Sequence, residues 1–118
     1  MPFGLEVVVE KSSLAGLGEK LLAAARAASS GRSAQTVHGG HAKVLRQTVI
    51  ALVAGQGLDE HENPGDATLH VLTGHVRLTS GDDNCDAVGG ELVVIPDARH
   101  SLAAIEDSVI LLTVAKLA

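Results

Sequence analysis

The feature that most constrains this chain is a series of short, β-rich segments that follows residue 34. The strand-like segments include "VLRQTVIALV", "ATLHVLTG" and "SVILLTVAKL", which are rich in the branched residues that favour strands. Between such segments stand "AGQG", "ENPGD" and "TSGDDN", which are typical of turns. Strands spaced this closely, with so little helix, predict a closed antiparallel β-barrel or a two-sheet sandwich.

The N-terminal part of the chain has a different pattern. Apolar residues in "SSLAGLGEKLLAAARAASSG" recur at helical spacing, Ser12 or Ser13 can cap the start, and Gly31 can end the helix. A length of 118 residues suits one hydrophobic core. We therefore expect one mostly β domain, with a strand and helix extension over residues 1–33 and a barrel over residues 34–118.

Composition excludes several classes of function. Nine Lys and Arg against 14 Asp and Glu give a net charge of −5, which disfavours nucleic acid and anionic membranes as partners. Phe3 is the only aromatic residue, so the stacking surfaces that bind single-stranded nucleic acid cannot form. Cys85 is the only cysteine, which excludes an intrachain disulfide and fits a reducing compartment. With no signal-peptide pattern and no apolar stretch of about 20 residues, we expect a cytoplasmic protein.

Two spaced motifs carry a family resemblance. The first conserved motif of the cupin superfamily is resembled by four residues here, Gly55, His61, Asn63 and Gly74. Five residues separate Gly55 from His61, and one residue separates His61 from Asn63. That motif runs glycine, histidine, histidine, glutamate and glycine at fixed spacings.

The second motif of the same family is matched by Gly90, Pro96 and His100. The gap from the proline to the histidine is four positions here and five in the family, and Ala98 stands near the place of a family glycine. The resemblance covers about residues 44 to 116.

The resemblance implies a small barrel of two packed antiparallel sheets, the double-stranded β-helix or jelly roll. It also implies three histidines and one glutamate around a divalent metal such as Fe, Mn, Ni or Zn. Here His61 and His100 match the first and third histidines, whereas Asn63 and Ala67 occupy the positions of the second histidine and the glutamate. An amide oxygen is a weak, neutral donor, so we expect a weakened metal site.

Other residues could replace the lost ligands. Strand alternation predicts that Asp59 shares a face with His61, and Asp66 directly precedes the vacant glutamate position. The same alternation turns His70 outward, so it is a reserve ligand only if a β-bulge reverses its direction.

Further polar residues have two interpretations each. Either Arg46 or Gln47 must face the interior or an interface, and an inward Arg46 would offer a clamp for carboxylate or phosphate. The alternative for Arg46 is a surface ion pair. His38 and His41 could bind a metal together, although a polar turn is the simpler interpretation. His75 is expected at a strand edge.

Several strands are apolar on both faces. The runs "TVIALV", "LVVI" and "VILLTV" leave an apolar outer surface that one helix cannot cover completely. This pattern predicts a homodimer that packs sheet on sheet.

Three functions remain open. The preferred one is a binding module that holds a small molecule, a weakly bound divalent metal or both in the barrel interior, in a sensor or accessory role. The second is a metal-dependent cupin enzyme, an oxygenase, isomerase or decarboxylase, that uses His61 and His100. The third is a metal-free acid/base catalyst built on the same two histidines. The fold alone does not choose among them.

Overall fold

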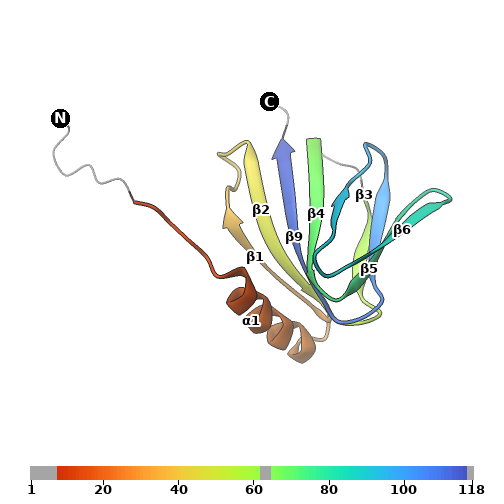
Figure 1. The fold of residues 1–118 in the computed structure, drawn as a ribbon, viewed down its shortest axis with the longest axis horizontal. Helices are drawn as coiled ribbons and strands as arrows, with labels where there is room; N and C mark the ends of the chain where they lie inside the picture. The colour runs from red at the N-terminus through yellow and green to blue at the C-terminus, as the bar shows by residue number, and fades with distance from the viewer. Residues whose placement is uncertain (1–7, 62–64, 117–118) are drawn as a thin grey trace.

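The structure is a computed structural model that describes residues 8–61 and 65–116, with His61 described by its backbone alone. The described residues form one helix and nine strands in two antiparallel sheets (Figure 1). One sheet has the order β1-β2-β9-β4-β7 and the other has the order β3-β8-β5-β6. The elements are α1 (Leu14–Ala27), β1 (Arg32–His38), β2 (Leu45–Leu52), β3 (Gly57–His61), β4 (Gly65–Thr73), β5 (His75–Ser80), β6 (Asp83–Val88), β7 (Leu92–Val94), β8 (His100–Ala104) and β9 (Ser108–Lys116).

The main core lies between the two sheets and follows from the alternation of side chains along each strand. In β4, Ala67, Leu69 and Val71 are buried, whereas the residues between them face outward. The opposite sheet supplies Leu102 and Val76 to the same cluster. The mostly β, two-sheet architecture expected from the sequence is thus confirmed.

The helix begins at the predicted cap, whereas it ends at Ala27, before Gly31. The amide N–H of Gly16 donates to the Ser13 side-chain oxygen at 3.1 Å, which caps the helix. Gly31 follows the helix with a φ of 66°, a conformation that favours glycine. A Cβ added at Gly18 would lie 3.1 Å from Val109 Cγ1, so this glycine allows close approach to the sheet.

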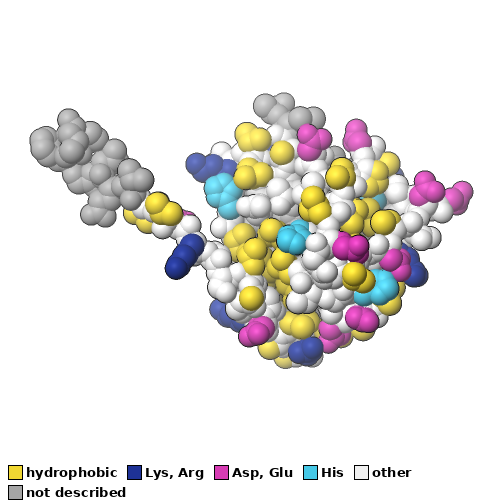
Figure 2. Space-filling model, viewed as in Figure 1, with side chains coloured by type: hydrophobic (Ala, Val, Ile, Leu, Met, Phe, Trp, Pro, Cys, Tyr) yellow, Lys and Arg dark blue, Asp and Glu magenta, His cyan; other side chains and the backbone are white. Residues whose placement is uncertain are grey.

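Helix α1 covers only part of the outer face of the five-stranded sheet. It packs beside β1 and β2 (Figure 1) and forms a second core, whose buried members are Leu21, Ala25, Val49, Ala51 and Val109. Away from the helix, Leu92 and Val94 are 62% and 74% exposed. Hydrophobic side chains also remain visible on the face seen in Figure 2.

The segment before the sheets contains the helix and little other regular structure among the described residues. The first strand begins at Arg32 and pairs with β2. Residues 8–13 form neither helix nor strand and lead away from the body (Figure 1). Among the helices that the structure describes, none is long and apolar enough to cross a bilayer.

One end of the barrel is closed by the turns that connect the two sheets. Gly74 links β4 to β5 with a φ of 96°, and a Cβ there would collide with the Ser108 hydroxyl. Ser108 is fully buried, accepts the His75 N–H at 3.0 Å and donates to the Glu106 carbonyl at 2.8 Å. The β4–β5 and β8–β9 connections between the sheets are therefore tied to a single hydroxyl.

We expect the Ile110→Ala substitution to lower the free energy of unfolding by about 2–5 kcal/mol, because Ile110 is fully buried between the sheets and the change leaves a cavity. Urea denaturation followed by circular dichroism measures the loss. The matched control is Ile105→Ala, at a side chain that is 41% exposed, where the loss should be much smaller. Equal losses at the two positions would contradict the placement of the core.

Candidate functional site

His100 is the most unusual residue of the interior. It begins β8, is 3% exposed, and alternation turns it inward with Leu102 and Ala104. A buried imidazole is costly unless its nitrogens are hydrogen-bonded. Its Nδ1 lies 2.9 Å from the Ala98 carbonyl oxygen, which holds the ring in a defined orientation.

This hydrogen bond selects the tautomer of His100. A carbonyl oxygen only accepts, so Nδ1 carries the proton, and in the neutral ring the lone pair lies on Nε2. Imidazoles that bind metals are commonly oriented by such a bond to a backbone carbonyl. Nε2 is therefore the nitrogen of His100 that would serve as a metal ligand or a hydrogen-bond acceptor.

His100 lies at the end of the barrel opposite the closed end. Strand β5 starts just after Gly74, and its Val76 pairs with Ala104, the last residue of β8. The first residue of β8 is therefore at the other end, near the beginning of β4. We call this the His100 end of the barrel.

A positively charged side chain, that of Arg46, belongs to the inner face at the His100 end. Arg46, Val114 and Ala67 stand in register across β2, β9 and β4. Residues opposite each other in a sheet share a face, and Val114 and Ala67 are buried in the main core, so Arg46 also faces inward. Its neighbour Gln47 faces outward and donates through Nε2 to the Thr113 hydroxyl at 3.2 Å.

Burial decreases along the inner face of β2 toward the His100 end. Leu52 and Ile50 are buried, whereas Thr48 and Arg46 are only half-buried. The facing strands do not follow this trend, because Val114, Ala67 and His100 are 4%, 6% and 3% exposed. The part of this end that solvent or a ligand can reach is therefore the side of β1 and β2.

Strand β3 runs antiparallel to the start of β8. Leu58 pairs with Leu102, and the backbone of His61 lies opposite His100, with a β-bulge between these two pairs. Asn63 lies outside the described residues. The register thus brings the backbones of the two predicted histidine ligands side by side.

A β-bulge in β3 makes the predicted orientation of Asp59 wrong. One extra residue between Leu58 and His61 breaks the alternation that predicted a face shared by Asp59 and His61. Asp59 is exposed and lines an open hollow of about 650 Å³ together with Ser101 and Ala103, which alternate outward on β8. It therefore lies on the outer side of its sheet.

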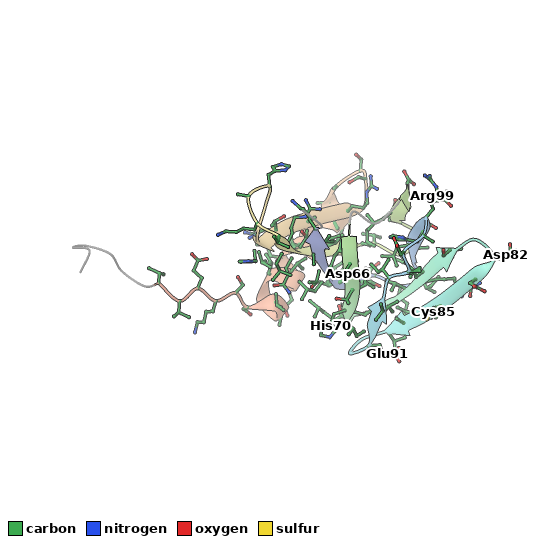
Figure 3. The ribbon with its side chains drawn as sticks, turned by 90° about the horizontal axis from the view of Figure 1, so that it is seen from above. Asp66, His70, Asp82, Cys85, Glu91 and Arg99 are labelled. Carbon is green, nitrogen blue, oxygen red and sulfur yellow. The ribbon has the colours of Figure 1, made fainter. Side chains whose placement is uncertain are left out.

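Asp66 and His70 both lie on the outer face of β4 (Figure 3). The pairing of β4 with β9 is continuous from Gly65 to Val71, so no bulge reverses the direction of His70, which points outward as predicted. Asp66 is exposed on the face opposite to Ala67. The suggestion that Asp66 replaces the missing glutamate is therefore wrong, because adjacent residues of a strand face opposite sides.

The described residues do not fit the four-ligand metal site that the family resemblance implies. Ala67 occupies the glutamate position on the inner face and offers no donor atom. Within residues 8–60 and 65–116, no three His, Cys, Asp or Glu side chains gather in a way that could hold a metal ion. His100 alone is an incomplete ligand set.

The largest pKa shift among the described residues lies away from this end of the barrel. Asp86 on β6 accepts from Arg77 Nε at 2.6 Å and Nη2 at 3.1 Å, and from His75 Nε2 at 2.8 Å. Hydrogen bonds from Arg77 and then from His75 lower the pKa of Asp86 to about 2. These side chains are partly exposed on the outer face, so we interpret the cluster as a structural ion pair.

The remaining candidates from the sequence lie on the surface. His38 and His41 are both exposed, at the end of β1 and in the following turn. Cys85 is exposed on the β5–β6 hairpin (Figure 3) and lines an apolar hollow of about 380 Å³ with Leu78 and Pro96.

Several solved structures share this fold. The conserved SPY1581 protein of unknown function from Streptococcus pyogenes is 28% identical, with a TM-score of 0.69 over 77% of this chain and 79% of that chain. An RmlC-like cupin from Desulfovibrio desulfuricans is 26% identical, with a TM-score of 0.62 over 71% of this chain and 81% of that one. A cupin superfamily protein from Desulfitobacterium hafniense is 17% identical, with a TM-score of 0.67 over 73% and 78%.

These likenesses, together with two antiparallel sheets packed around one interior, define the cupin fold. The chain therefore has the fold of the small cupins, as the two motifs predicted. No protein-family model matches the sequence, and no curated protein is significantly similar to it.

We expect Asp86→Asn to destabilise the protein near neutral pH, because the substitution removes the charge that pairs with Arg77 and His75. The pKa of Asp86 is lowered from 3.8 to about 2, so its contribution is present above about pH 4 and is lost as the pH falls toward 2. Unfolding curves of both proteins at several pH values measure the difference. Asp82→Asn, at the tip of the same hairpin (Figure 3), is the control, and a pH-independent difference for Asp86→Asn would contradict the assignment.

Proposed function

We propose that this cupin binds a small molecule at the His100 end of its barrel and that any divalent metal there is weakly held. The observation that carries the proposal is the buried His100 imidazole, fixed by its bond to the Ala98 carbonyl at the end of the barrel where Arg46 and Thr48 of β2 are only half-buried. Rigid polar groups in a partly apolar cavity are typical of small-molecule sites. The cupin fold of the neighbouring structures is compatible with this role.

Weak metal binding follows from the chemistry of the donor atoms. In the family pattern a glutamate supplies negative charge, and Ala67 replaces it here. A site with imidazole and amide donors alone does not offset the charge of Fe, Mn, Ni or Zn, so its affinity is low. We therefore favour a binding module in a sensor or accessory role, in the cytoplasm, over a metal enzyme.

A metal-dependent cupin enzyme is the second candidate. It is favoured by the register that sets the backbone of His61 opposite His100. In that case His61 and His100 would be ligands, and a metal bound there would supply Lewis-acid chemistry. The same two histidines would serve a metal-free acid/base catalyst.

We expect protein purified without an affinity tag to contain much less than one equivalent of Fe, Mn, Ni or Zn per chain, measured by inductively coupled plasma mass spectrometry. Organic extracts of the same protein should contain a small molecule that is missing from His100→Ala. His70→Ala is the matched control, because His70 lies on the outer face of β4. Nearly one equivalent of metal, lost in His100→Ala and kept in His70→Ala, would reverse the order of the two candidates.

A homodimer is also part of the proposal. The outer face of the five-stranded sheet exposes Leu92 and Val94 beside a row of uncharged residues, Thr68 and Thr113 among them. Asp66 adds an exposed carboxylate to the same face at the start of β4. In a two-fold dimer the same patch meets itself, so the uncharged area around Leu92 and Val94 can pack without repulsion between like charges. We propose that a second copy of this chain covers this face.

We expect Val94→Lys to shift the protein from dimer to monomer in size-exclusion chromatography with light scattering, because the lysine would place two like charges in one interface. The matched control is Val88→Lys, at an exposed valine of the other sheet. A monomeric wild-type protein, or a dimer unaffected by Val94→Lys, would contradict this interface.

A further inference from the structure

Arg46 is a positively charged residue on the inner face of β2, where Ile50 and Leu52 are apolar and buried. It stands opposite Val114 in the register of β2 and β9, and it is half-buried. The four ion pairs found among the described residues do not include Arg46. Buried arginines normally have an anionic partner, so an inward guanidinium without one in the described chain is a candidate for binding an anion from outside.

The neighbours of Arg46 make this region polar. Thr48, two residues along β2, shares the inner face, and Thr36 pairs with it from β1. Their hydroxyl oxygens lie 3.3 Å apart. We call Arg46, Thr48 and Thr36 the Arg46 strip. It combines five guanidinium N–H groups with two hydroxyls, which can donate to an oxygen-rich ligand.

The strip is open to solvent from the side of β1. Thr36 is exposed and Thr48 is half-buried, although both face the interior side of the sheet. Farther along the same face, Ile50 and Leu52 are buried in the main core. A ligand can therefore reach the Arg46 strip without displacing the packed core.

The net charge of the protein would not attract an anion. A net charge of −5 repels anions at long range, so recognition of an anion would depend on local contacts. The planar fork of a guanidinium matches the two oxygens of a carboxylate or a phosphate, and such charge-assisted bonds are the strong ones. Arg46 and His100 belong to the same end of one interior.

We propose that the ligand of this cupin carries an oxyanion, a carboxylate or a phosphate, which Arg46 binds while the rest of the ligand extends toward His100. This inference rests on the proposed small-molecule function and names the chemical class of the ligand. Thr48 adds a hydroxyl donor at the same site, and the Arg46 guanidinium sets the selectivity for charge.

Nuclear magnetic resonance of the full chain tests the proposal through the imidazole resonances of His100 and the Hε resonance of Arg46. The probes are succinate, inorganic phosphate and the neutral analogue succinamide, each titrated into wild type. We expect at least one of the two anions to shift both sets of resonances and succinamide to bind at least roughly tenfold more weakly, because it lacks the charge. Comparison of succinate with phosphate identifies the preferred oxyanion.

Variants of Arg46 complete the experiment. Arg46→Met should weaken binding of the preferred anion roughly 10- to 100-fold, and Arg46→Lys should give an intermediate loss because it keeps the charge without the planar fork. Lys43→Met removes the same charge from an exposed loop position and should bind like wild type. If Arg46→Met does not fold, weaker anion binding by Arg46→Lys than by Lys43→Met supports the proposal, and equal binding contradicts it.

The possible results separate this inference from the function on which it rests. If succinamide shifts the His100 resonances as strongly as succinate and the Arg46 variants bind normally, oxyanion recognition is wrong while small-molecule binding stands. If neither anion shifts the Arg46 resonance at millimolar concentration, the inference is overturned. If no small molecule, charged or neutral, perturbs His100 and organic extracts contain none, both proposals fail.

Discussion

The packing of two apolar sheet faces against each other is the constraint on which the rest of this molecule depends. Residues of each strand alternate between the interior and the outside, and that alternation decides which side chains can reach a ligand. At the closed end, residues such as Leu52, Val71 and Ile110 fill the space completely. At the other end the same alternation turns His100 and Arg46 inward, beside buried residues such as Ala67 and Val114. The candidate site is thus a local interruption of the hydrophobic core.

Several features of this arrangement can be predicted from the sequence because they depend on residues that are close together in the chain. The cap at Ser13, one of two predicted serines, and the outward direction of His70 each depend on a few neighbouring residues, and both agree with the prediction. The helix ends at Ala27, earlier than the predicted stop at Gly31. Asp59 was misplaced because a β-bulge is set by pairing with a distant strand, and no signal within "GLDEH" reveals it. Arg46 and Gln47 were left as alternatives for the same reason. Only the register of β2 with β9 shows that Arg46 is the inward residue.

The absence of a carboxylate at Ala67 bears on the charge of the interior. Ala67 lies on the inner face of β4, where the resemblance to the cupin motifs implies a glutamate. A methyl group there neither attracts a divalent cation nor repels a carboxylate or phosphate, whereas a carboxylate would do both. Because Arg46 also faces inward, this part of the interior is electrostatically better suited to an anion than to a cation.

The buried Ser108 hydroxyl has a mechanical consequence for the barrel. It joins the backbone at His75 to the backbone at Glu106, so the two sheets are tied where the chain crosses between them. Ser108 belongs to the five-stranded sheet and His75 to the four-stranded sheet, so this hydroxyl links the two sheets directly. One small side chain thus holds the two sheets at a fixed distance at this end of the barrel.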